Sequence, residues 1–339
     1  MLRLSFVAFL CLSQACAFSA SQAPPSSGQP GLPPGSLRLE REIPLPGVQG
    51  RIDHLAADVA GQRVFVAALG NGTLEIVDVA QGKRVAQIKD LKEPQGVAYV
   101  PSTGAVYVAG GGDGTVRSFD SHTLKPLHDV ALGDDADNLR YDAARQQLLA
   151  GYGTGAIAVL GLDLSHRANL PLPVHPESFQ LTADGQGVFV NLPDNRSIAS
   201  IDLGTQTVNP NWGHPSAAGN FAMTLDATIH RLFIPCRKPS RLQTFKTETG
   251  GISTWTMTAG DADDIFVNEV LRIVYVIGGE GWVDVLYVRA ADAMVSRQKM
   301  PTAPGARTGL YVPEWNKLLV AAPRQGDKEA RLLVFAVEQ

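Results

Sequence analysis

The chain has 339 residues, of which 45% are hydrophobic and 18% are charged. This composition excludes a disordered or fibrous protein and allows a large buried core. Lysine and arginine total 29 against 33 aspartate and glutamate residues, for a formal net charge of −4, and no dense basic run occurs. Nucleic acids and anionic membranes are therefore not expected as partners.

Residues 1–20 are predicted to be a secretory signal peptide. Arg3 is followed by the apolar run Leu4 to Leu12 and then by small residues around Ala15 to Ala23, which is the order of charged, apolar and cleavage regions in such peptides. The apolar run is too short to span a bilayer, so no membrane span is expected. The predicted destination is the periplasm or the extracellular medium.

The positions of the three cysteines are compatible with export. Cys11 and Cys16 lie within the predicted signal peptide, so the exported chain would keep Cys236 alone and could form no internal disulfide. Lipidation of Cys16 is an open alternative, although the aliphatic residue expected three positions before such a cysteine is missing. Cys236 ends an apolar stretch, and we expect a buried structural thiol.

Residues 21–36 are predicted to be a linker. They contain five Pro, three Gly and four Ser, a composition typical of a flexible or polyproline-like tether. Residues 37–44 then alternate apolar and charged side chains, as a half-exposed strand does. The folded domain is therefore predicted to span residues 37–339.

A repeat runs through this domain. Its anchor is the first apolar residue after a short polar cluster, and successive anchors are 42, 42, 40, 42, 44 and 45 residues apart. Self-similarity at such a period indicates a repeat architecture. The domain therefore contains seven repeat units, whose anchors are Leu55, Val97, Leu139, Phe179, Phe221, Ile265 and Leu310.

Each unit contains further predicted strands. A continuous apolar run follows each anchor, as at residues 63–67 or 272–276, and turn residues lead into a third strand, as at 115–120. A more polar fourth strand, such as 83–89, closes most units. Continuous apolar runs mean that both faces of each sheet are covered. Four-stranded units packed face to face around an axis describe an all-β, seven-bladed β-propeller.

The two ends of the domain are expected to meet in one blade. The seventh unit stops after its third strand, residues 331–337. We expect the strand at 37–44 to pair with it as the outer strand of the last blade. That pairing would close the ring and remove an exposed sheet edge.

The second strands also carry a family resemblance. Val-Phe-Val-Ala-Ala-Leu-Gly-Asn at 64–71, Val-Tyr-Val-Ala at 106–109, Val-Phe-Val-Asn at 188–191 and Val-Tyr-Val at 274–276 resemble the YVTN repeat. Over residues 37–339 the chain resembles the secreted YVTN-family, YncE-like β-propeller proteins of bacteria. The resemblance implies the fold and export, and it implies no particular reaction because the family has no generally established one.

Polar residues precede the anchors in every unit. The first strands of propeller blades line the central channel in one direction, so equivalent positions form rings around its axis. Four such rings hold eight carboxylates, two arginines and two histidines, which predicts an acidic channel mouth that attracts cations or cationic groups. The candidate ligand-binding residues are Arg51, Asp53, His54, Asp137, Asn138, His175, Glu177, Asn220, Asp263, Asp264 and Arg307.

A metal site and a carboxylate clamp are two alternatives within this mouth. One subset offers the oxygens that a divalent cation such as Ca²⁺, Mg²⁺ or Mn²⁺ prefers: Asn138, Glu177, Asn220 and Asp264. It is similar to the metal set of gluconolactonase-type propellers, which have six blades, so the comparison is a chemical analogy. Alternatively, Arg51 and Arg307 could together bind a carboxylate.

We interpret the chain as a monomeric, exported binding scaffold whose acidic channel mouth holds a small molecule, a cation or a partner protein. The alternative is a metal-dependent, lactonase-like hydrolase or lyase, with His54 or His175 as the candidate catalytic acid or base. A third hypothesis is a structural module in which the ring residues only cap strands and hold water. Fold alone does not decide among them.

Overall fold

The computed structural model of the chain describes residues 32–289 and 292–339. The predicted signal peptide, the predicted linker up to residue 31, and residues 290–291 lie outside this range. Within the described ranges, no helix has the length and apolar character needed to cross a membrane.

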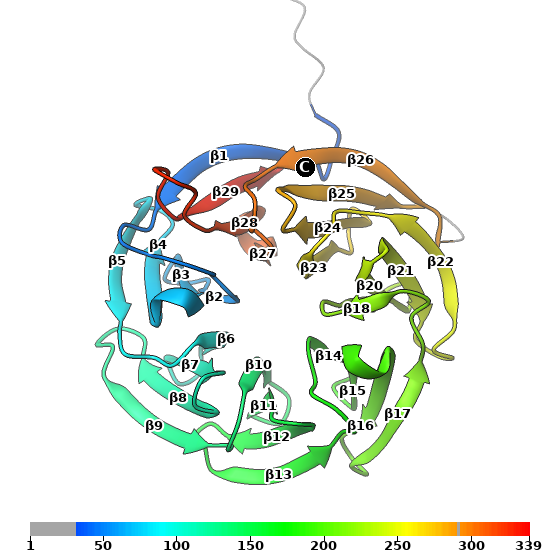
Figure 1. Ribbon diagram of the computed structural model, residues 1–339, viewed down its shortest axis with the longest axis horizontal. Coiled ribbons are helices and arrows are strands. Elements are labelled where there is room, and N and C mark those ends of the chain that lie inside the picture. Colours follow the sequence, from blue (N-terminus) through cyan, green and yellow to red (C-terminus); the bar gives the residue numbers. More distant parts are fainter. Residues whose placement is uncertain (1–31, 290–291) are drawn as a thin grey trace, which may run out of the picture. The chain divides into compact units, whose positions relative to one another are not determined.

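Seven antiparallel sheets surround a central axis (Figure 1). The chain therefore folds as an all-β, seven-bladed β-propeller, as the repeat predicted. The first three blades comprise β2 (Leu55–Asp58), β3 (Arg63–Ala68), β4 (Thr73–Asp78) and β5 (Lys83–Ile88); β6 (Pro94–Val100), β7 (Ala105–Gly110), β8 (Thr115–Asp120) and β9 (Pro126–Ala131); and β10 (Ala136–Asp142), β11 (Gln147–Tyr152), β12 (Ala156–Gly161) and β13 (His166–Pro171).

The other four blades continue the series. They comprise β14 (Phe179–Leu181), β15 (Gly187–Leu192), β16 (Ser197–Asp202) and β17 (Thr207–Gly213); β18 (Ala218–Asn220), β19 (Thr224–Asp226), β20 (Arg231–Lys238), β21 (Ser240–Lys246) and β22 (Ile252–Met257); β23 (Ala262–Asn268), β24 (Ile273–Gly278), β25 (Trp282–Val288) and β26 (Met294–Pro301); and β27 (Thr308–Val312), β28 (Lys317–Ala322), β29 (Arg331–Val337) and β1 (Leu37–Pro44).

The core lies between neighbouring blades. The second strand of each blade is covered on both faces, and every residue of β7 and β24 is buried, which explains their continuous apolar sequences. Aromatic side chains recur at one position of five of these strands and are buried: Phe65, Tyr107, Phe189, Phe233 and Tyr275. The outer strands face solvent, as the exposure of most of β9 shows.

Cys236 lies on β20 and is buried, as expected from its apolar neighbours. The Gln243 side-chain amide donates to its Sγ over 3.0 Å. Burial raises the pKa of this thiol to about 11, so it remains protonated at neutral pH. It is a packing residue rather than a reactive one.

The fifth blade departs from the predicted pattern. A single inner strand was expected around the anchor Phe221, but β18 ends at Asn220 and β19 begins at Thr224. The reason is a change of backbone partner, because the Phe221 carbonyl accepts the Ser178 N–H of blade 4 over 3.1 Å. Gly219, within β18, has a φ of 76°, a conformation that glycine adopts readily.

The ring closes where the two ends of the domain pair. β1 lies antiparallel to β29, from Leu37 opposite Val337 to Pro44 opposite Arg331, and Figure 1 shows β1 as the outer strand of the last blade. The predicted closure is confirmed. Ile43 is fully buried between blades 7 and 1.

Ile43→Ala should lower the free energy of unfolding by about 2–5 kcal/mol, because it leaves a cavity at the seam. The matched control is Leu39→Ala on the same strand, where Leu39 is 45% exposed and the change should cost less than about 0.5 kcal/mol. Chemical denaturation of both variants measures the difference. Equal losses would contradict the view that β1 closes the core.

Candidate binding site at the channel mouth

The polar residues before the anchors meet across blade boundaries. Arg51 of blade 1 lies 3.7 Å from Asp263 of blade 6, and His54 lies 3.3 Å from Asp264. Backbone groups follow the same pattern, since the Asp264 N–H donates to the Arg307 carbonyl over 3.1 Å. Equivalent positions on the innermost strands therefore face a common channel.

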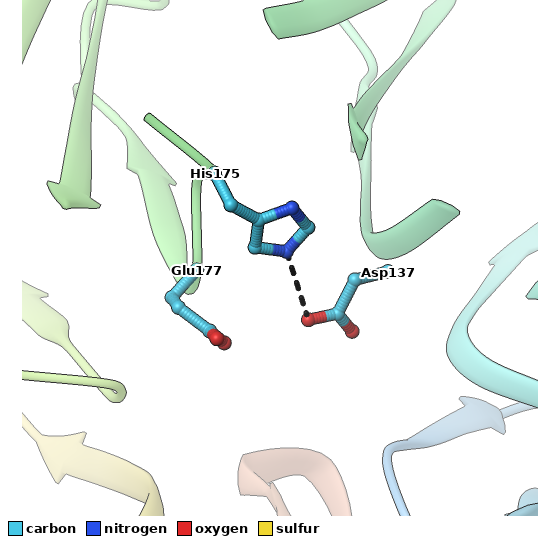
Figure 2. Close-up of side chains that lie close together, drawn as sticks. All are labelled: Asp137, His175 and Glu177. Atoms are coloured by element: carbon cyan, nitrogen blue, oxygen red, sulfur yellow. Dashed lines mark ion pairs between the residues drawn. The ribbon is translucent and has the colours of Figure 1, made fainter. Parts of the chain in front are cut away.

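Asp137, His175 and Glu177 form one cluster at the channel mouth (Figure 2). One ligand atom from each lies within 4.8 Å of the other two. Asp137 belongs to β10 of blade 3, whereas His175 and Glu177 precede β14 of blade 4. The cluster therefore spans a blade boundary and depends on how the two blades pack.

The orientation of His175 is set by the backbone. Its Nδ1 lies 2.6 Å from the Gly153 carbonyl oxygen, so this nitrogen carries a proton and donates it. Nε2 then faces Asp137, with 4.0 Å to Oδ2, as the dashed line in Figure 2 shows. A carbonyl that fixes one ring nitrogen and leaves the other facing carboxylates is a common arrangement around metal-binding histidines.

The three groups of the cluster shift one another's pKa values. Burial opposes the charge on His175, but Asp137, the Gly153 carbonyl and Glu177 outweigh it and raise the His175 pKa to about 9. Burial and the nearby charges of Asp137 and Asp263 hold the pKa of Glu177 well above its usual range. Glu177 is therefore a carboxyl group that resists ionisation unless a positive charge joins it.

His54 lies between two carboxylates farther along the channel. Its Nδ1 is 3.3 Å from Asp264 Oδ1 and its Nε2 is 3.8 Å from Asp53 Oδ1. Burial opposes protonation, yet the charges of Asp264 and Asp53 raise the His54 pKa to about 10. Burial raises the Asp53 pKa to about 7 against the opposing effects of His54 and Arg51. His54 is therefore an imidazolium at neutral pH.

Three arginines pair with acids of blades 1 and 6. Arg51 is hydrogen-bonded to Asp53 over 2.9 Å, and Arg307 reaches Asp261 over 3.0 Å. Arg237 of β20 pairs with Asp263 and stacks over the Phe221 ring at 4.0 Å. Arg51 and Arg307 thus each pair with neighbouring acids.

Two buried amides complete the predicted set. Asn220 donates its side-chain N–H groups to Asn191 Oδ1 and the Ser197 carbonyl, each over 3.1 Å. The side-chain oxygens of Asn138 and Asn220 are buried and accept no hydrogen bond from any described residue. Of the oxygen set predicted to hold a metal, Glu177 also belongs to the cluster with Asp137 and His175, while Asp264 binds His54 and the Gly309 N–H.

Two arginines near the channel were not anticipated. Arg237 lies at the end of a second strand, and Arg140 follows the anchor Leu139, whereas only positions before the anchors were considered. Both bring positive charge to a channel that was predicted to be acidic. The signal that could have found Arg140 is a charged residue directly after the anchor, a position at which the other six units carry an uncharged residue.

Open space adjoins the cluster. A hollow of about 550 Å³ is lined by Glu93, Asp134, Asp135 and His175, together with the turn residues Gly153 and Thr154. These turns join second and third strands at the end of the blades where the inner strands begin. Of the three cluster residues, His175 is the one that lines this hollow.

Comparisons with known proteins establish the fold only. No protein-family model matches the chain, and no curated protein sequence matches it. A chain from the crystal structure of the mitotic checkpoint complex superimposes with a TM-score of 0.75 at 14% identity, over 96% of this chain and 99% of that one. A chain of Kuenenia stuttgartiensis hydrazine synthase gives a TM-score of 0.75 at 14% identity, over 87% and 99%.

His54→Gln should remove a pH-dependent contribution to stability. Because folding raises the His54 pKa from 6.5 to about 10, this contribution is fully present below about pH 6.5 and is lost as the pH rises through about 10. Denaturation from pH 6.5 to 10 should show a steeper decline for the wild type than for the variant across this interval, and the difference in slope should disappear above about pH 10. The control, His166→Gln at the exposed end of β13, should follow the wild type, and parallel curves for His54→Gln would contradict the assignment.

Proposed function

We propose that this protein is an exported binding scaffold that holds a divalent cation at its channel mouth through Asp137, His175 and Glu177. The observation that carries the proposal is the convergence of these three ligand atoms within 4.8 Å of one another. They come from two adjacent blades, so the rigid packing of the propeller sets their geometry. Pre-positioned ligands of this kind reduce the entropy cost of binding.

Buried carboxylate oxygens beside the cluster support a cation. Asp53 Oδ1 and Asp263 Oδ2 accept no hydrogen bond within the described ranges, and their contacts with cationic side chains are long, at 3.8 Å to His54 for Asp53 and 3.7 Å to Arg51 for Asp263. The charge of Asp137 raises the Asp53 pKa, and the charge of Asp263 raises the Glu177 pKa. These acids therefore lie near one another in the channel. Buried acceptors are rarely left without a partner, and a bound cation would lower the cost of placing several acids together.

The ligand types select the cation. One imidazole nitrogen with two carboxylates suits Mn²⁺ or Zn²⁺ better than Ca²⁺, which prefers a shell of oxygens. Three protein ligands also leave coordination positions open. The 550 Å³ hollow beside His175 gives a small molecule or a partner's side chain room to occupy them.

Export and family membership are supported by the sequence pattern. Residues 1–20 have the layout of a signal peptide, and the second strands carry the YVTN-like motif within a fold that agrees with it. Cys236, the cysteine of the described domain, is free and buried, which is compatible with an oxidising compartment. Immunodetection of the protein in periplasmic, medium and cytoplasmic fractions tests the destination.

Glu177→Gln and Asp137→Asn should each weaken Mn²⁺ and Zn²⁺ binding at least about tenfold, because each removes a charged ligand. Calorimetric titration of the purified protein measures the affinity. Glu248→Gln, an exposed residue in the turn after β21, is the control and should bind like the wild type. Unchanged affinity in both site variants would contradict the proposal.

A metal-dependent, lactonase-like hydrolase is the second candidate. It is favoured by the two buried amide oxygens of Asn138 and Asn220, which lack hydrogen-bond donors among the described residues and could complete an oxygen site with Glu177 and Asp264. Asp264→Asn separates the candidates. It should abolish metal binding and lactone hydrolysis if this set holds the ion, whereas His175→Gln should abolish metal binding if the proposed cluster holds it.

A further inference from the structure

A second cavity lies along the channel beyond the polar rings. It measures about 310 Å³, and His54 and Asp264 form one end of it. Its walls are residues at and after the anchors, including Ala57, Tyr99, Tyr141 and Phe266. The innermost strands run from the channel mouth toward these residues, so this cavity and the hollow beside His175 lie toward opposite ends of those strands.

Arg140 is the cationic group of this cavity. It lies on β10, directly after the anchor Leu139, and contributes to the lining. Nε donates to the Phe179 carbonyl over 3.1 Å, and the two terminal nitrogens donate to the Leu139 carbonyl over 2.8 Å and to Ser178 Oγ over 3.4 Å. The guanidinium also stacks over the Phe179 ring at 5.4 Å. Its position is therefore held firmly by blades 3 and 4.

These contacts leave part of the guanidinium available. The group has five N–H donors, and three of them are used by the bonds to Leu139, Phe179 and Ser178. Each terminal nitrogen keeps one N–H without an acceptor among the residues that the structure describes. A pair of such N–H groups is the donor arrangement that binds carboxylates.

Within the described part of the chain, Arg140 has no direct counter-ion. The charges of Asp264 and Asp137 raise the Arg140 pKa, but Arg140 forms no ion pair with a described carboxylate. Each of these two acids is already paired with a histidine, Asp264 with His54 and Asp137 with His175. Burial lowers the Arg140 pKa, although an arginine stays protonated at neutral pH. A positive charge without a direct ion pair among the described residues therefore faces the cavity.

We infer that this cavity binds a small organic monocarboxylate, with the carboxylate on Arg140 and an apolar body against Tyr99, Tyr141 and Phe266. A desolvated cation without a counter-ion is costly, and an anion offsets that cost. Aromatic walls bind an apolar body, and the cavity volume suits a ligand near the small end of the usual range. This site is separate from the proposed cation cluster and does not depend on it.

Three sets of matched probes test the charge requirement. Benzoate, phenylacetate and hexanoate carry the carboxylate, whereas the corresponding primary amides and amines share the apolar body with a neutral or positive head. Ligand-observed NMR titration of the purified protein measures the affinities. We expect at least one carboxylate to bind about tenfold more tightly than its amide, because a charge-assisted bidentate bond replaces a neutral one. We expect no detectable binding of the amines.

Two variants locate the binding. Arg140→Gln should weaken carboxylate binding at least about tenfold, and Ala57→Leu should do the same by filling the cavity while leaving Arg140 in place. Arg297→Gln is the matched control, because Arg297 on β26 also donates to a carbonyl, that of Pro34 over 3.0 Å, and stacks over Tyr287 at 4.0 Å. If Arg140→Gln fails to fold, judged by circular dichroism, Ala57→Leu decides.

Three results would overturn the inference. The first is that none of the three carboxylates binds. The second is that the amides or amines bind as tightly as the carboxylates, which would show that Arg140 is not the recognition group. The third is wild-type affinity in folded Arg140→Gln or in Ala57→Leu, which would place the binding elsewhere.

Discussion

The pairing of β1 with β29 is the constraint on which the rest of the molecule depends. It joins the two ends of the domain in one blade and leaves blades 7 and 1 packed across a shared core that includes Ile43 and Val64. A closed ring fixes the inner strands relative to one another. The polar side chains at their ends are therefore brought together from blades far apart in the sequence, as His54 and Asp264 are.

Charge balance in the channel follows from this enforced proximity. Burial penalises each charge, so the acids are stable only with cations beside them. His54 lies beside Asp53 and Asp264, and Arg237 forms an ion pair with Asp263. Among the described residues neither Glu177 nor Arg140 forms an ion pair, although the charge of His175 lowers the Glu177 pKa, and these two exceptions are the groups on which the two proposed sites rest.

The architecture was predictable because the repeat and the strand patterns can both be read directly from short segments of the sequence. The repeat period and the apolar second strands predicted seven blades, and the alternating segment at 37–44 predicted the closing strand, which is observed as β1 with those bounds. The division of the fifth inner strand was not predictable, because it depends on a backbone bond between Phe221 and Ser178 of another blade.

The site was predictable only in outline. Positions before the anchors identified the channel-facing acids, but their partners come from other strands and other blades. The pairing of Arg237 with Asp263 links a second strand to the next blade, and nothing in the local sequence indicates it. Likewise, the contact between His175 and Asp137 depends on the packing of blades 3 and 4. Ring position predicts which residues approach the axis, but the sequence pattern does not predict which of them touch.

The most direct test of the proposed function is the metal content of the mature protein, purified from its native compartment without chelators and measured by plasma mass spectrometry. We predict about one equivalent of Mn or Zn per chain, because the cluster of Asp137, His175 and Glu177 provides one set of converging ligands. Less than about a tenth of an equivalent, together with no uptake of added Mn²⁺ or Zn²⁺, would contradict a cation-binding role.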